Sequence, residues 1–186
     1  VKFFVKISLF LINSFLFFAL FCPAKWKITS NLLMFFSISE KELLVPNLKV
    51  FRPADTIETF ECWELALADN NSPSVIALSR QKINPVRKKY DYENKCSSGA
   101  YEILRTNKTI ELTILATGSE VNLALEVSHK LATQNIYSKV VSVPSLELFN
   151  IQSEKYKREI MSETKYKISI EAGVTEPWKK YVGENG

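Results

Sequence analysis

The sequence is poor in the residues that build metal centres and disulfide frameworks. Its single histidine, His129, lies in a predicted helix, so no multi-histidine metal site is expected and we interpret it as a surface residue. The three cysteines, Cys22, Cys62 and Cys96, are an odd number without paired spacing, which argues against both a disulfide framework and a zinc site. Reduced thiols in a cytoplasmic protein fit this pattern best.

The charge pattern gives little support for a nucleic-acid partner. The 186 residues include 24 lysines and arginines and 20 acidic residues, a net charge of +4. Five basic residues fall between Arg80 and Lys89, but no aromatic residues alternate with them as they do in proteins that stack single-stranded bases. A solvent-exposed loop is the preferred interpretation of this basic run, and a phosphate or nucleic-acid patch is the alternative.

Residues 1–40 differ in composition from everything that follows. Nine of the twelve phenylalanines lie in the first 36 residues, and basic residues flank an apolar run from Ile7 to Cys22. This layout is typical of a signal peptide and is close to the lower length limit of a membrane span, so residues 3–22 could associate the protein with a membrane. Translated A/T-rich non-coding DNA and a buried apolar helix are the competing interpretations of this leader.

Short apolar stretches alternate with helical patterns from residue 46 onward. Leu48–Phe51 is a predicted strand, and Ser74–Leu78 is the next one. Between them, Asp55 is a good helix N-cap with Glu58 three residues later, and the predicted helix runs to about Ala68. A strand, a helix and a strand of these lengths predict a βαβ unit with two parallel strands.

The second half of the chain repeats this alternation after a stretch without strong periodicity. Residues 82–108 are expected to form a linker, and no strand or helix is expected to close the chain around Trp178. Thr117 and Glu120 have capping-box spacing. The other predicted elements are strands at 109–116, 139–143 and 166–171 and helices at 119–133, 146–149 and 154–161. The alternation predicts an α/β fold of three-layer units with mainly parallel sheets, incomplete at both ends.

Two loops follow predicted strands, where open α/β sheets bind ligands. Arg80 comes directly after the strand that ends at Leu78, and its guanidinium could bind a phosphate or pair with a neighbouring carboxylate. The loop before the helix at 119–133 is better suited to capping than to anion binding. Glu61 and Glu64 are expected on a solvated helix face, and Cys62 is expected to serve packing.

Several motifs resemble the transketolase family, and together they span roughly three quarters of the chain. They are VFRPADT at 50–56, ECWELAL at 61–67, LSRQ at 78–81, GAYE at 99–102, ATGSEV at 116–121, VSVPS at 141–145 and EAG at 171–173. The resemblance implies the end of a pyrimidine-binding domain at 46–81, a linker at 82–98 and a truncated C-terminal domain at 99–186. Residues 1–40 fall outside it.

The resemblance implies a transferase of the pentose phosphate pathway that moves a two-carbon ketol group between sugar phosphates. Members of the family use thiamine diphosphate with a divalent metal, Mg²⁺ or Ca²⁺, and work as cytoplasmic homodimers. The arginine of the SRQ motif helps to hold the substrate phosphate in the family, which assigns this role to Arg80. No catalytic, cofactor-binding or metal-binding residue can be assigned in this chain, and the chain alone is expected to bind no cofactor and to be inactive.

Two other classes of function compete with an enzyme fragment. One is a non-catalytic interaction module that docks on a complete or a split transketolase. The other is an α/β domain tethered to a membrane through the leader.

Overall fold

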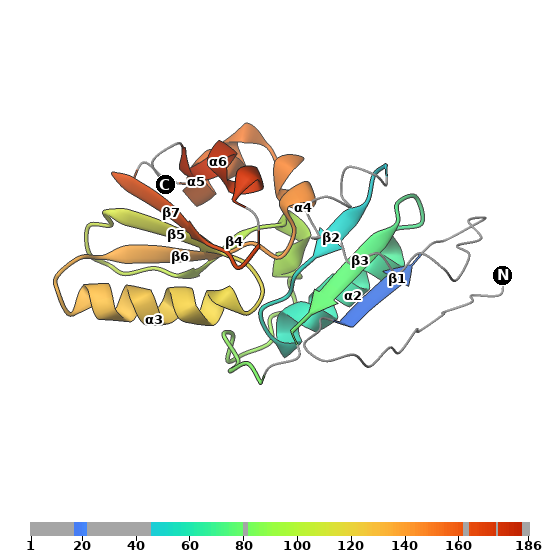
Figure 1. The fold of residues 1–186 in the computed structure, drawn as a ribbon, viewed down its shortest axis with the longest axis horizontal. Helices are drawn as coiled ribbons and strands as arrows, with labels where there is room; N and C mark the ends of the chain where they lie inside the picture. Colours follow the sequence, from blue (N-terminus) through green and yellow to red (C-terminus); the bar gives the residue numbers. More distant parts are fainter. Residues whose placement is uncertain (1–16, 22–45, 80–81, 162–163, 174, 184–186) are drawn as a thin grey trace.

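Two sheets lie next to each other in the structure, a computed structural model that describes residues 17–21, 46–79, 82–161, 164–173 and 175–183 (Figure 1). The smaller sheet has the strand order β1-β3-β2 and the larger one β4-β6-β5-β7. Among the described residues, no helix has the length and apolar character needed to cross a membrane. Most of the leader lies outside the described residues, and so do its competing interpretations.

The smaller sheet contains the predicted βαβ unit. Strand β2 (Lys49–Phe51) pairs in parallel with β3 (Ser74–Leu78), and helix α2 (Thr56–Ala68) connects them. Strand β1 (Phe17–Phe21) runs antiparallel along the other edge of β3. The prediction of a parallel strand pair joined by a helix is therefore confirmed.

The larger sheet is mainly parallel and has helices on both faces, so this unit has three layers. Strands β5 (Leu112–Ala116), β6 (Ser138–Ser142) and β7 (Tyr166–Ile170) are parallel, and β4 (Tyr101–Leu104) joins β6 in the antiparallel sense. Helix α3 (Glu120–Ala132) covers one face (Figure 1). The opposite face carries α4 (Leu146–Asn150), α5 (Glu154–Met161) and α6 (Glu176–Val182). The predicted α/β class is confirmed.

Two segments differ from the predictions. The stretch 82–108, expected to be a linker without regular structure, contains the 3₁₀ helix η1 (Lys95–Ser98) and strand β4. A closing helix, α6, is also present around Trp178, which is buried. The elements in these segments are short, so local periodicity indicates them only weakly and tertiary contacts stabilise them. Strand β4 is an edge strand with an irregular register, and α6 packs its tryptophan against the sheet.

The two predicted helix caps have different outcomes. Asp55 caps α2 as predicted, because its Oδ1 accepts a hydrogen bond from the Glu58 N–H at 2.9 Å and the Glu58 side chain reaches back to the Ala54 N–H. The prediction of a capping box at Thr117 is wrong. The Thr117 hydroxyl donates to the carbonyl oxygen of Arg52, and no side chain caps the start of α3. A contact with a distant part of the chain has replaced the local one.

One apolar cluster of the described residues is shared by both sheets. Phe51, Cys62 and Ile76 from the smaller unit pack with Tyr101 and Leu148 from the larger one. Each of these side chains is at most 8% exposed, so little water reaches this contact. Cys62 therefore serves packing, as predicted. The two units share a core instead of meeting only at their surfaces.

Gly99 offers a test of how closely the segments pack. It ends η1 at φ 75°, and a Cβ atom there would lie 2.1 Å from the Phe149 nitrogen and 2.5 Å from the Ser145 oxygen. We expect Gly99→Ala to lower the free energy of unfolding by about 2–5 kcal/mol, because a strained backbone and a steric overlap add. Urea unfolding followed by tryptophan fluorescence measures this change.

Gly183 is the matched control for this substitution. Its φ is 82°, but a Cβ atom would have no neighbour within 4 Å. Gly183→Ala should therefore cost only the backbone strain, about 1–3 kcal/mol, because φ 82° with ψ −176° is a region that almost only glycine adopts. Equal losses in the two variants would contradict the close packing around Gly99.

Candidate functional site

The carboxyl ends of the parallel strands in the two sheets face one another. Arg52 follows β2, and its backbone N–H donates to the Pro144 oxygen, beyond the end of β6, at 2.8 Å. Its carbonyl oxygen accepts from the Gly118 N–H, after β5, at 3.1 Å. Ligands of open α/β sheets bind at such strand ends. Here the backbone of Arg52 occupies the space between them.

The Arg52 side chain extends this contact between the two sheets toward β7. Its guanidinium forms an ion pair with Glu171, the first residue after β7, and lies 3.8 Å from a carboxylate oxygen of Glu120. The Glu171 side chain is only 4% exposed, so this pair is largely shielded from water. Arg52 is thus already held by carboxylates. From sequence the residue was considered only within the VFRPADT motif, and this role was missed.

The turn before α3 is unsuitable for an anion. A Cβ atom at Gly118 would lie 3.7 Å from the Glu120 carboxylate and 3.9 Å from Arg52, so parts of the chain itself line this helix start. A nearby carboxylate repels phosphate. This helix start therefore does not suit a diphosphate. Within the described ranges, no group of three histidine, cysteine or acidic residues could hold a metal ion.

A row of carboxylates on α2 faces the larger sheet. Asp55, Glu58 and Glu61 are spaced three residues apart, which places them along one side of the helix, and all three are buried. Asp55 accepts hydrogen bonds from the N–H groups of Val86 and Arg87 at 3.1 and 2.9 Å. The carboxylate that caps the helix therefore also holds the segment that follows the smaller sheet.

Glu61 is the last member of the row, and its predicted position on a solvated face is wrong. It is 3% exposed and accepts a hydrogen bond from the Arg87 guanidinium at 2.7 Å. It also accepts one from the Cys96 N–H at 3.2 Å. Glu64, one turn further, is exposed as expected, and its carboxylate accepts from Asn94 at 2.8 Å. The partner of Glu61 lies 26 residues away, beyond the reach of a local pattern.

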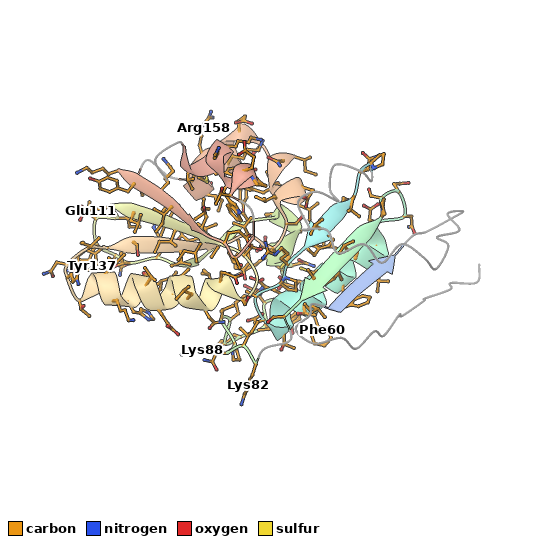
Figure 2. The ribbon with its side chains drawn as sticks, in the orientation of Figure 1. Phe60, Lys82, Lys88, Glu111, Tyr137 and Arg158 are labelled. Atoms are coloured by element: carbon orange, nitrogen blue, oxygen red, sulfur yellow. The ribbon has the colours of Figure 1, made fainter. Side chains whose placement is uncertain are left out.

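The basic run is therefore only partly a solvated loop. Lys82, Lys88 and Lys89 are exposed, and Figure 2 shows Lys82 and Lys88 pointing away from the body of the protein. Arg87 is instead buried between Glu61 and the ring of Tyr101, whose centroid lies 5.5 Å from the guanidinium carbon. One member of the run thus has a structural partner.

Glu58 is the middle and most enclosed carboxylate of the row. One oxygen accepts from the hydroxyl groups of Tyr101 and Ser142, both at 2.6 Å, and the other accepts from the Ala54 N–H at 2.6 Å. Burial raises the pKa of Glu58, and these three hydrogen bonds oppose that rise without cancelling it. Burial and the neighbouring Glu58 also raise the pKa of the Tyr101 phenol.

The predicted phosphate ligand, Arg80, lies outside the described residues together with Gln81. Ser79, which precedes it, is half-buried directly after β3. The residues before Arg80 therefore lie at the carboxyl end of β3. This end is next to the carboxyl end of β2, which Arg52 follows. His129 is exposed on α3 as predicted.

Comparisons with known proteins match both units. A model of the transketolase pyrimidine-binding domain matches residues 43–85, and one of the transketolase-like C-terminal domain matches residues 99–186. Transketolase of Sinorhizobium medicae is 44% identical over 142 residues, which is 76% of this chain and 20% of that protein. Transketolase of Rhodobacter capsulatus is 42% identical over 142 residues, again 76% of this chain and 21% of that protein.

Solved structures agree with these matches. Transketolase of Pichia stipitis, in complex with sedoheptulose-7-phosphate, superposes with a TM-score of 0.67 at 30% sequence identity. The match covers 79% of this chain and 21% of that one. The chain therefore spans about a fifth of the length of the relatives that it matches.

The buried ion pair of Arg87 and Glu61 gives a prediction for the stability of the contact between the two units. Arg87→Met removes the cation and leaves the Glu61 carboxylate buried without its charged partner. We expect the free energy of unfolding to fall by about 3–5 kcal/mol, as is typical when one partner of a buried ion pair is removed. Chemical denaturation of the purified variant measures the loss.

Arg105→Met is the matched control. Arg105 pairs with Glu102 at 3.3 Å, but its side chain is 60% exposed, so water screens the pair. The same substitution there should cost no more than about 1 kcal/mol. A comparable loss in both variants would argue against a special role for the Glu61 pair.

Proposed function

The chain belongs to the transketolase family, and from this premise we propose that it forms part of an enzyme that transfers ketol groups between sugar phosphates. Its share would be the end of the pyrimidine-binding domain, with the loop after β3, and the C-terminal domain held against it. The two family matches carry this proposal, because they occur in one chain in the order of the two units. The proposed enzyme is a cytoplasmic homodimer of the pentose phosphate pathway.

We assign the substrate phosphate to Arg80. The residue follows β3 at the carboxyl end, the usual place for a ligand in an open α/β sheet. A guanidinium binds phosphate oxygens through two parallel hydrogen bonds, which lysine cannot reproduce. The Pichia stipitis relative was solved with a sugar phosphate, which supports a substrate of this class. Arg52, after the neighbouring strand, is already paired with Glu171 and is a poorer candidate.

The family cofactor is expected to bind outside this chain. In the family, thiamine diphosphate with Mg²⁺ or Ca²⁺ supplies the carbanion chemistry. The helix start at Gly118 lies beside the Glu120 carboxylate, whose charge would repel a diphosphate. We propose that other parts of the enzyme bind the cofactor, while this chain contributes phosphate binding and the joint between the two domains.

A chimaera tests the proposal. Residues 43–186 of this chain replace the matching stretch of the Rhodobacter capsulatus transketolase, which is 42% identical. We expect this chimaera to transfer ketol groups between sugar phosphates in a coupled assay. A folded chimaera that binds thiamine diphosphate but lacks turnover would contradict the proposed function.

Arg80→Ala in the same chimaera tests the residue. Loss of a charge-assisted pair with phosphate should raise KM for phosphorylated aldoses by roughly 10- to 100-fold, since such hydrogen bonds contribute about 1.5–3 kcal/mol. Turnover of an unphosphorylated aldose should change little. Lys82→Ala removes an exposed cation two residues away and is the control. Equal effects on both classes of substrate would count against a phosphate ligand at Arg80.

The isolated chain should show no ketol transfer. The family cofactor carries out the reaction, and this chain spans only about a fifth of the length of the relatives that it matches. Calorimetric titration with thiamine diphosphate and Mg²⁺ should give no binding heat, and the coupled assay should give no rate above background. Turnover by the purified chain without any partner would show this expectation to be wrong.

A further inference from the structure

The row of three carboxylates on α2 has an excess of negative charge. Asp55, Glu58 and Glu61 are each no more than 8% exposed. Among the described residues, Arg87 is the one cation that forms an ion pair with this row. An unpaired charge in a protein interior is expensive, and a buried acid relieves that cost by taking up a proton. Their surroundings show which of the three carries the proton.

Asp55 has the surroundings of a charged carboxylate. One oxygen accepts from the Glu58 N–H at 2.9 Å, and the other accepts from the Val86 and Arg87 N–H groups. Backbone N–H groups can only donate, so all three bonds require Asp55 to accept. The residue also lies at the positive end of the α2 dipole, which favours negative charge.

Glu61 is charged as well. Its oxygens accept from the Arg87 guanidinium at 2.7 Å and from the Cys96 N–H at 3.2 Å. An arginine side chain keeps its proton in proteins, so it can be neutralised only by an anionic partner. Arg87 has this partner in Glu61, so it is not available to neutralise Glu58.

Glu58 differs from both neighbours. It is 0% exposed, and two of its three partners are hydroxyl groups, those of Tyr101 and Ser142 at 2.6 Å. A hydroxyl can donate or accept, so a protonated Glu58 can donate to one of them while its other oxygen accepts from the Ala54 N–H. This arrangement satisfies the carboxyl group itself, and the hydroxyl that accepts from Glu58 must direct its own proton to another acceptor.

The other titratable groups around Glu58 do not favour a charge. Asp55 and Glu61 on its own helix are anionic, and Cys62 on that helix is buried in the apolar cluster. Tyr101 on β4 and Cys96 on η1 are neutral in their usual forms, and burial raises the pKa of the Tyr101 phenol further. Each of them would carry a negative charge if it ionised. Arg87 is committed to Glu61.

We infer that Glu58 keeps a proton in the folded chain at neutral pH, and that this neutral carboxyl group is the positioning residue that fixes α2 to strands β4 and β6. Its hydroxyl partners lie 43 and 84 residues away in the sequence, so one side chain links the βαβ unit to two strands of the larger sheet. The inference concerns the joint between the units and does not depend on ketol transfer.

The consequence is a specific pH dependence of stability. A glutamate in the unfolded chain has a pKa of about 4.3, so a folded state that keeps the proton binds one proton more than the unfolded state above that pH. Stability from Glu58 is therefore complete below about pH 4.3 and is lost as the pH rises toward the folded pKa. The unfolding equilibrium constant should rise by up to about tenfold per pH unit from this residue.

Glu58→Gln isolates this contribution in the full chain. The carboxamide stays neutral at every pH and can donate to a hydroxyl while accepting from the Ala54 N–H. We expect the ratio of the native unfolding constant to that of the variant to grow by up to about tenfold per pH unit above pH 4.3. Urea titrations from pH 4.5 to pH 8 measure it. A ratio that does not change with pH overturns the inference.

Infrared spectroscopy gives a direct second readout. At pH 7 in D₂O, the native-minus-Glu58→Gln difference spectrum should contain the carbonyl band of a protonated carboxyl group. Glu64→Gln makes the same change on the exposed side of α2, and its difference spectrum should show only carboxylate bands. Absence of the protonated band from the Glu58→Gln spectrum overturns the inference, whatever the stability of the variant.

Discussion

The cost of burying charged groups shapes the junction between the two units of this protein. Helix α2 directs three acidic side chains into the contact with the larger sheet, where water cannot solvate them. Each needs donors from elsewhere in the chain, and these come from Val86, Arg87, Cys96, Tyr101 and Ser142. The segment between the sheets is therefore held in place by hydrogen bonds and is not a free linker.

This constraint explains why the two units pack as one body. The apolar cluster around Phe51 and Tyr101 supplies the hydrophobic contact, which is largely non-directional. The carboxylates and Arg52 add direction, because hydrogen bonds and ion pairs require particular distances and angles. Arg52 brings the end of β2 against the ends of the larger sheet, including Glu171 after β7. The proposed phosphate loop follows β3, the neighbour of β2, so these contacts also hold the strand from which the loop begins.

Features that depend on nearby residues were predictable from the sequence. The pairing of Asp55 with Glu58, the parallel strands of the βαβ unit and the packing role of Cys62 follow from short-range spacing and apolar periodicity. Glu61 and Thr117 were misinterpreted for the same reason. Their partners, Arg87 and Arg52, are 26 and 65 residues away, and nothing within one helical turn indicates them. A basic residue and a buried acid far apart in sequence give no periodic signal.

The sequence by itself determined the α/β class, the main parallel strands and the family, because apolar patterns and motifs persist along the chain whatever its three-dimensional contacts. It also named Arg80 as the residue to test. Only the tertiary structure decided which acids are buried, which arginines are already paired and why Glu58 has hydroxyl partners instead of a cation. The protonation and pairing of a side chain depend on the burial and charges around it, and folding sets both by joining distant segments.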